Sequence, residues 1–261
     1  MFLTAGVGKN SPNRPEDVLI VQALLNLNLS RLLPLPPLVE DASFGRFSQA
    51  YITEFQRRFV PSEVGMDAVR PDSATLAELL KGKAVKLDLQ MLEVLMPLAR
   101  AEHAARYFEP LVQCMATNQI DTPLRQAHFL AQLGHESGSF RFPEEIADGR
   151  QYEGRVDLGN TQPGDGPRFK GRGLIQITGR VNYAAFGKAR TRDFVTGDNP
   201  KLLATDPMLA ADCSGWYWTS RGLNAMADRD DVRQITLRIN GGFNGLDDRT
   251  RRLRLAKCLL L

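Results

Sequence analysis

The segment His135-Glu136-Ser137-Gly138-Ser139-Phe140 holds the residue types best suited to catalysis. The helix of a zinc protease also carries His-Glu, but it needs a second histidine three residues after the glutamate, where this chain has Ser139. A three-histidine zinc site would require every histidine of the chain, which has three. We therefore expect neither a metal nor another cofactor, and we interpret Glu136 as a carboxylate for acid–base chemistry.

A helix that would carry this glutamate is predicted from about Thr122 to Ser137, with Pro123 in its first turn. Glu136 follows Leu133 by three residues and should therefore emerge beside apolar groups. Such surroundings favour the neutral carboxylic acid and keep its proton available for donation. That is the setting of a glycosidase acid, and the alternative is an ordinary exposed glutamate at a helix end.

A glycosidase acid needs a second carboxylate that faces it, and inverting enzymes keep the two roughly 6.5–9.5 Å apart to admit a water. Four candidates follow Glu136 along the chain: Glu144, Glu145, Asp148 and Glu153. Their spacing does not choose among them. Pro143 favours a turn that would bring one of them back across a cleft.

The stretch from Gly149 to Gly179 contains eight glycines in 31 residues, which predicts loops and tight strands in place of a helix. Within it, 174–178 alternates as a short strand with Gln176 and Thr178 on one face. Uncharged polar side chains of this kind suit sugar hydroxyl and N-acetyl groups. The alternative is an edge strand whose polar face is solvated.

The remaining pattern is mainly helical. Residues 16–29 have the spacing of an amphipathic helix. A second helix, capped near Ser48, should point Phe47, Tyr51, Ile52 and Phe55 inward. Further helices are predicted after Ser73, over 87–98, over 206–221 and near the C-terminus.

The composition, 43 % hydrophobic and 24 % charged, is that of a globular protein, and no apolar run reaches the roughly 18 residues needed to span a bilayer. The three cysteines, Cys114, Cys213 and Cys258, show no metal or disulfide spacing and should be reduced core residues. The net charge of +3 arises in 84–261, with 24 basic and 21 acidic residues against nine of each in 1–83. No basic stripe interleaved with aromatic residues indicates nucleic-acid binding.

Residues 6–80 resemble the small three-helix peptidoglycan-binding domain often joined to lytic enzymes. The matching residues are Val18-x-x-Val21-Gln22, Asp41-x-x-Phe44-Gly45, Phe55-Gln56, Asp67 and Thr75-Leu76. The resemblance predicts a peptidoglycan-binding domain over 1–83. The segment Lys81-Gly-Lys-Ala at its end is predicted to link it to the rest of the chain. The alternative is a helical bundle without affinity for the cell wall.

Residues 90–255 resemble the family 19 glycoside hydrolases, a chitinase-like group that includes many phage endolysins. The matching stretches are His135-Glu136-Ser137-Gly138, Tyr152-Glu153-Gly154-Arg155, Pro163-Gly164-Asp165-Gly166, residues 169–180, Asn182-Tyr183, Trp216-Tyr217-Trp218, Ile239-Asn240-Gly241-Gly242 and Asp248-Arg249. The resemblance predicts a catalytic domain over 84–261. The expected fold is mainly α: a small three-helix domain, then a larger lysozyme-like helical domain with a short β element.

The same resemblance implies roles for individual residues. Glu136 would be the acid and Glu145 the second carboxylate, which activates a water. Gln176, Thr178, Tyr183 and Asn240 would contact sugar or water, and Arg249 would lie near the carboxylates. The assignment to Glu145 leaves Glu144 and Glu153 as alternatives.

The function implied is hydrolysis of β-1,4 bonds in bacterial peptidoglycan with inversion of configuration. The chain lacks the long loops and disulfides of plant chitinases, which favours the lysozyme-like branch of the family. Alternatives are a true chitinase and a wall-binding protein without turnover. We further expect a monomer without stable membrane insertion, made in the cytoplasm because no signal peptide is recognisable, and acting on the wall after release.

Overall fold

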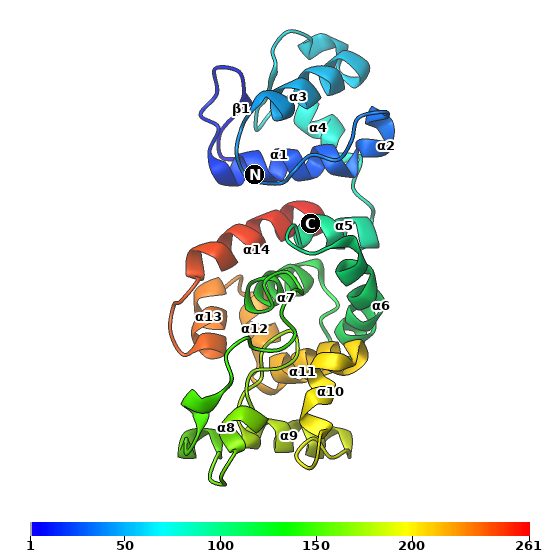
Figure 1. The fold of residues 1–261 in the computed structure, drawn as a ribbon. Coiled ribbons are helices and arrows are strands. Elements are labelled where there is room, and N and C mark those ends of the chain that lie inside the picture. The colour runs from blue at the N-terminus through cyan, green and yellow to red at the C-terminus, as the bar shows by residue number, and fades with distance from the viewer. Residues whose placement is uncertain (1) are drawn as a thin grey trace. The chain divides into compact units, whose positions relative to one another are not determined.

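The computed structural model describes residues 2–261 and divides into two compact units (Figure 1). The first comprises the described residues up to Pro97 together with Arg254–Leu261, and the second is Leu98–Leu253. The first unit thus continues past the boundary predicted after residue 83. Within residues 2–261, no helix combines the length and the apolar character needed to cross a bilayer.

The first unit is built on short helices, of which all but the one-turn helix Leu29–Leu32 begin close to predicted positions. They are α1 (Pro15–Leu27), α2 (Leu29–Leu32), α3 (Arg46–Phe59), α4 (Ala74–Leu80) and α5 (Leu89–Leu95). Ser73 caps α4 by accepting a hydrogen bond from the Leu76 backbone N–H at 3.1 Å. The patterns gave no sign of the antiparallel pair formed by β1 (Val7–Gly8) and β2 (Ala68–Val69).

One predicted core residue of α3 lies outside the core. Phe47 is 63 % exposed, whereas Tyr51, Ile52 and Phe55 are buried as expected. Tertiary packing buries the stripe Ser48, Ile52, Phe55 and Gln56, at the spacing i, i+4, i+7 and i+8, and Phe47 in the first turn of α3 lies outside it. Ser48 is not the cap of α3, which begins at Arg46, but is buried and accepts a hydrogen bond from the Gln22 side chain.

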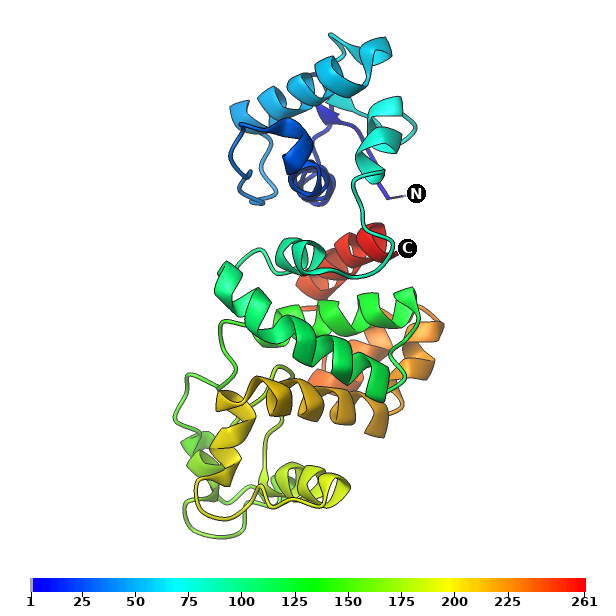
Figure 2. The same ribbon diagram turned by 90° about the vertical axis from the view of Figure 1, so that its right-hand side faces the viewer.

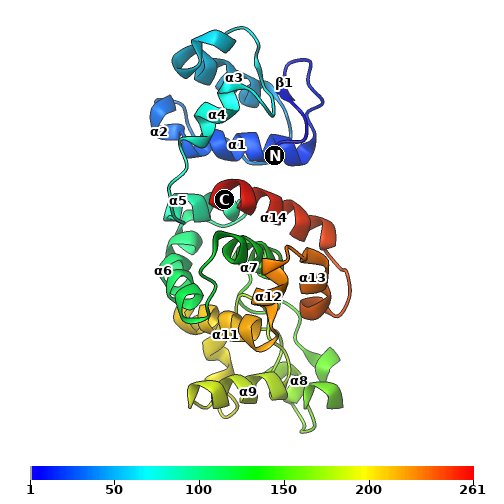
Figure 3. The same ribbon diagram turned by 180° about the vertical axis from the view of Figure 1, so that it is seen from behind.

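The second unit is a larger helical assembly, which confirms the mainly α fold class. Its helices are α6 (Ala101–Thr117), α7 (Pro123–Glu136), α8 (Asp165–Arg168), α9 (Arg180–Arg190), α10 (Leu202–Thr205), α11 (Pro207–Ser220), α12 (Leu223–Asp228), α13 (Val232–Asn240) and α14 (Leu246–Leu260), whose last residues belong to the first unit. Helix α6 packs along α11 (Figure 2). Helix α7 packs against α12 in the interior (Figure 3), and its Phe129 meets Trp218 of α11 edge to face at 5.3 Å.

The glycine-rich segment differs from its predicted form. It includes the single turn α8 and the 3-10 turns Arg150–Tyr152 and Val156–Leu158. The strand predicted over 174–178 is instead a tight turn, closed by pairing of Arg172 with Ile177, with Gln176 at φ 59°. Leu174 and Ile175 are both buried although they are neighbours, so the segment folds back on itself and does not present alternate faces.

All three cysteines are buried and unpaired, as predicted. Burial raises the pKa of the Cys114 thiol to about 12 and that of Cys258 to about 11. Such thiols stay protonated near neutral pH and behave as core residues.

Candidate active site

A cavity of about 390 Å³ in the second unit gathers most of the predicted site residues. It is lined by Glu136, Glu145, Tyr152, Leu158, Gly171, Ile175, Gln176, Ile177, Thr178, Asn182, Tyr217, Ile239 and Asn240. Five of the seven predicted residues are in this set, and Tyr183 and Arg249 are not. Two carboxylates, several uncharged polar groups and aromatic rings therefore share one hollow, the composition typical of a ligand site.

Helix α7 ends at Glu136 and so presents its carboxylate at the cavity. Thr122 caps the other end by accepting a hydrogen bond from the Arg125 backbone N–H at 3.2 Å. After Ser137 the chain reverses through Ser139 and Phe140, whose φ values are 60° and 66°. The Ser137 hydroxyl supports the reversal because it donates to the Leu133 carbonyl and accepts from the Phe140 N–H at 2.9 Å.

The environment of Glu136 differs from the apolar one expected. Its Oε1 accepts a hydrogen bond from Nη2 of Arg249 at 2.5 Å, and its side chain is 16 % exposed. The Arg249 side chain is 1 % exposed and also donates to Oε1 of Gln132. Arg249 therefore lies against the proposed acid, as the resemblance implied, and reaches it from beneath the cavity surface.

A second pair lies beside the first. Nδ1 of His135 is 2.8 Å from Oδ2 of Asp248, which also accepts from Arg252 at 2.8 Å. The hydrogen bond with His135 and then the Arg252 partner hold the pKa of the Asp248 carboxyl well below its usual range. Gly245 packs directly against the imidazole, since a Cβ there would lie 2.1 Å from the ring. Two neighbouring side-chain pairs, His135–Asp248 and Glu136–Arg249, thus join the end of α7 to the start of α14.

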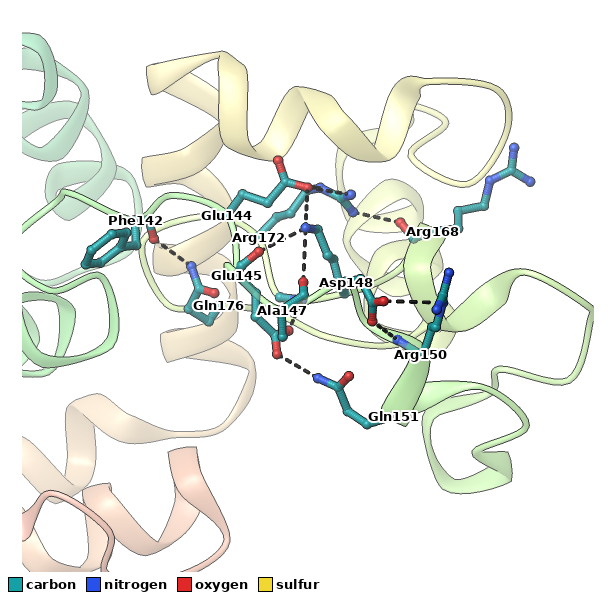
Figure 4. Close-up of polar contacts among 12 residues, drawn as sticks. Phe142, Glu144, Glu145, Ala147, Asp148, Arg150, Gln151, Arg168, Arg172 and Gln176 are labelled. Carbon is teal, nitrogen blue, oxygen red and sulfur yellow. Dashed lines mark hydrogen bonds and ion pairs between the residues drawn. The ribbon is translucent and has the colours of Figure 1, made fainter.

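Glu145 is brought to the cavity by backbone pairing with the glycine-rich segment. Its N–H donates to the Gly171 carbonyl at 2.9 Å, and the Gly173 N–H donates to the Pro143 carbonyl at 2.9 Å. The side chain accepts a hydrogen bond from Gln151 at 2.9 Å (Figure 4). It also accepts from the Tyr152 hydroxyl at 3.0 Å and from the Gly171 N–H at 3.1 Å. These donors fix the direction of the carboxylate.

The other candidates for the second carboxylate lie outside the cavity lining. Glu144 pairs with Arg172 at 2.9 Å and with Lys170 at 3.2 Å (Figure 4). Glu153 accepts backbone N–H donors at the start of α8, from Gly164 at 2.6 Å and from Gly166 at 2.7 Å. Asp148 is exposed and accepts from the Arg150 N–H. Of the four carboxylates, Glu145 is the one that shares the cavity with Glu136.

Two of the polar residues predicted to bind sugar, Gln176 and Thr178, are positioned by hydrogen bonds to backbone carbonyls. The Gln176 amide donates to the Phe142 carbonyl at 2.9 Å and to the Gly173 carbonyl at 3.0 Å. Its Oε1 lies close to Gly171, where an added Cβ would be 2.8 Å from that oxygen and 3.3 Å from Oε2 of Glu145. Thr178 donates to the Gln176 carbonyl at 3.1 Å. Asn240 is the last residue of α13 and is exposed.

Tyr183 does not occupy the position expected of a sugar contact. The residue is fully buried, and its hydroxyl donates to the Lys170 carbonyl at 2.7 Å and accepts from Arg172 at 3.2 Å. Its ring packs on Phe169 with centroids 5.3 Å apart. The predicted contact is therefore corrected, because Tyr183 supports residues 170–172 from inside the fold.

Three cavity residues with polar side chains were not assigned a role from the sequence: Tyr152, Asn182 and Tyr217. Each belongs to a stretch that matches the family 19 pattern, and this membership was the sequence signal that could have identified it as a site residue. Asn182 donates to the Thr178 carbonyl at 2.7 Å. Tyr217 is largely buried, and this burial raises the pKa of its hydroxyl.

A second cavity, of about 370 Å³, lies within the first unit. Its lining combines apolar residues with carboxylates and amides: Asn26, Leu29, Pro37, Leu38, Val39, Glu40, Gln90, Glu93, Val94 and Pro97. Glu40 accepts a hydrogen bond from the Asn26 amide at 2.8 Å. Burial raises the pKa of Glu40 to about 7 despite this hydrogen bond.

Sequence comparisons define the family of the second unit. The family described as class I chitinase matches residues 119–232. A glycosyl hydrolase family 19 domain-containing protein of Haemophilus influenzae is 37 % identical over 163 residues, which is 50 % of this chain and 78 % of that protein. An endochitinase of Arabidopsis thaliana is 39 % identical over 116 residues, 44 % of this chain but only 39 % of its own length.

Solved structures share the fold. Chitinase C from Streptomyces griseus superposes with a TM-score of 0.55 at 21 % identity, over 66 % of this chain and 76 % of that one. A class IV chitinase from Zea mays gives 0.52 at 20 % identity, over 66 % and 89 %. The chain belongs to glycosyl hydrolase family 19. It is a chitinase-like glycoside hydrolase, which cleaves glycosidic bonds of glycans.

Proposed function

We propose that this hydrolase cleaves the β-1,4 bonds of bacterial peptidoglycan with Glu136 as general acid and Glu145 as general base. One observation carries the assignment: the two carboxylates line the same cavity although they come from different segments. Hydrolysis by this pair inverts the anomeric carbon, because Glu145 activates a water on the face opposite the leaving group.

Arg249 makes the two carboxylate oxygens of Glu136 chemically different. It bonds Oε1, so Oε2 is the atom that carries the proton to the glycosidic oxygen. When the proton has left, the guanidinium stabilises the carboxylate that remains. Glu145 keeps a fixed direction through its three donors, so the water that it activates attacks from one side.

Peptidoglycan is proposed over chitin because of the rest of the chain. The first unit has the helices predicted for a wall-binding domain, and its 370 Å³ cavity offers carboxylate and amide groups to a ligand. The free cysteines also separate it from disulfide-bonded plant chitinases. We include in the proposal an endolysin role, in which a monomer made in the cytoplasm reaches the wall after release.

A chitinase is the second candidate, favoured by relatives and structural neighbours that are named as chitinases. Parallel digestion of purified peptidoglycan and soluble chitin oligomers separates the two. We expect new reducing-end sugars from peptidoglycan, identified by mass spectrometry. Cleavage of chitin oligomers with intact peptidoglycan strands would overturn the proposal, as would the release of stem peptides alone.

Wall binding by the first unit is tested with the full chain carrying Glu136→Gln, which removes the proposed acid without removing the binding unit. This variant should sediment with insoluble peptidoglycan. If it stays in the supernatant with peptidoglycan at every concentration, the binding assignment is wrong. Adding Glu40→Gln and Glu93→Gln should weaken sedimentation if the 370 Å³ cavity holds the ligand.

A further inference from the structure

Arg221 follows α11 directly and contacts two residues of the active-site cavity. Its guanidinium carbon lies 3.7 Å from the ring centroid of Tyr217, and its Nη2 donates to Oδ1 of Asn182 at 3.1 Å. Both partners line the cavity. Stacking on one face and a hydrogen bond at one edge fix the guanidinium before any ligand arrives.

No carboxylate of the described residues 2–261 neutralises the charge of Arg221, whereas two other arginines near the cavity are paired with glutamates. Arg249 pairs with Glu136, and Arg172 pairs with Glu144 at 2.9 Å. Among residues 2–261, Arg221 forms no ion pair with a carboxylate oxygen within 4.0 Å. Apart from Asn182, its side-chain acceptor is the Ser220 hydroxyl at 3.4 Å. A guanidinium carries five N–H donors, so several remain for a ligand.

An ordered, unneutralised guanidinium beside a sugar site favours a substrate with negative charge. Arginine binds carboxylates through paired hydrogen bonds of matching geometry. Chitin chains are neutral, whereas the stem peptides of peptidoglycan carry carboxylates next to the glycan. We infer that Arg221 is a specificity-determining residue that binds a stem-peptide carboxylate at the cavity; this rests on the proposed function.

The test compares two forms of one substrate. Purified peptidoglycan is used either untreated or after its carboxylates have been converted to amides with carbodiimide and ammonia. On untreated substrate, Arg221→Gln should lower kcat/KM about tenfold, in the range expected for one charged hydrogen bond, and mostly through KM. On amidated substrate, the wild type and Arg221→Gln should have the same kcat/KM. Arg221→Lys should retain part of the preference for untreated substrate.

The matched control is Arg192→Gln, which removes the same charge. Arg192 is exposed and lies over Phe194 at 5.3 Å, away from the cavity lining. It should behave as wild type on both substrates, and thermal unfolding should show that each variant is folded. Equal loss by Arg221→Gln on both substrates, or an equal loss by Arg192→Gln, would overturn the inference alone. If the wild type cleaves chitin oligomers but neither the untreated nor the amidated peptidoglycan, the proposed function is overturned.

Discussion

The carboxylate of Glu136 and the guanidinium of Arg249 meet at 2.5 Å across a sequence separation of 113 residues. One is the last residue of α7 and the other lies in the first turn of α14. The same guanidinium bonds the buried Gln132, one turn before Glu136. The position of the proposed acid therefore depends on how the start of α14 packs against the end of α7.

Arg249→Gln should reduce both activity and stability. Loss of one preorganised charged donor at a reacting group costs roughly 10²–10³-fold in kcat. Breaking a buried ion pair costs about 3–5 kcal/mol, and the lower end applies because Glu136 is partly exposed. Steady-state kinetics and urea unfolding followed by tryptophan fluorescence measure the two effects.

The control is Arg251→Gln in the same turn. The Arg251 side chain is 47 % exposed, and its contact with Asp248 is 3.8 Å long, so the variant should remain close to wild type. Wild-type kcat in Arg249→Gln would show that the pair does not serve catalysis.

Asp248 should make the free energy of unfolding decrease at acidic pH. Its pKa is lowered in the folded state by His135 and Arg252, so the unfolded chain binds more protons as the pH falls below about 4. The stabilisation is present above that pH and is lost as the pH falls toward the folded-state pKa. Urea midpoints should fall less between pH 5 and pH 3 in Asp248→Asn than in wild type. The exposed neighbour Asp247, changed to Asn, should keep the wild-type slope.

Gly171→Ala should damage the site more than the fold. The new Cβ would lie 2.8 Å from Oε1 of Gln176 and 3.3 Å from Oε2 of Glu145. The Gln176 side chain must move, and the Glu145 carboxylate must give by a few tenths of an ångström. Because a displacement of about 1 Å can cost about 10²-fold in rate, we expect a smaller loss here, of roughly tenfold or less. Kinetics and thermal unfolding distinguish the effects. Gly45→Ala is the control because its Cβ would meet nothing within 4 Å; unchanged kcat/KM in Gly171→Ala would refute the close approach.

Glu40 should make the first unit less stable as the pH rises. Its pKa is raised from 4.5 to about 7 by burial, so the folded state holds the proton more tightly than the unfolded state. Stability is full below about pH 4.5 and falls as the pH rises through 7, by up to about 3 kcal/mol. Calorimetry at pH 5 and pH 8 should show a smaller decline for Glu40→Gln. An equal decline in both proteins would contradict the assignment.

The sequence predicted the parts of this fold that are specified locally. Thr122 and Pro123 mark the start of α7, and the apolar periodicity carries it to Glu136. Ser73 likewise locates α4. These signals lie within one helix and need no partner elsewhere in the chain. The predictions failed where tertiary packing decided the outcome, as for the strand expected over 174–178 and for Phe47.

The site followed the same division. Glu136 could be proposed from the sequence because its motif is contiguous. The choice among four acidic residues needed the backbone pairing of 143–145 with 171–173, which spacing does not reveal. Tyr183 was misplaced because its motif gave its identity but not the direction of its side chain. The His135–Asp248 pair joins residues 113 positions apart, so the spacing of residues along the chain did not predict it either.

The most direct test of the account measures reducing ends released from purified peptidoglycan by Glu136→Gln, Glu145→Gln and Glu144→Gln. General acid–base groups contribute about 10²–10⁴-fold each. The first two variants should therefore lose at least about 100-fold in rate while remaining folded. Glu144→Gln should retain most of the wild-type rate, since Glu144 pairs with Arg172 and lies outside the cavity lining. A rate near wild type in folded Glu136→Gln would contradict the assignment of the acid.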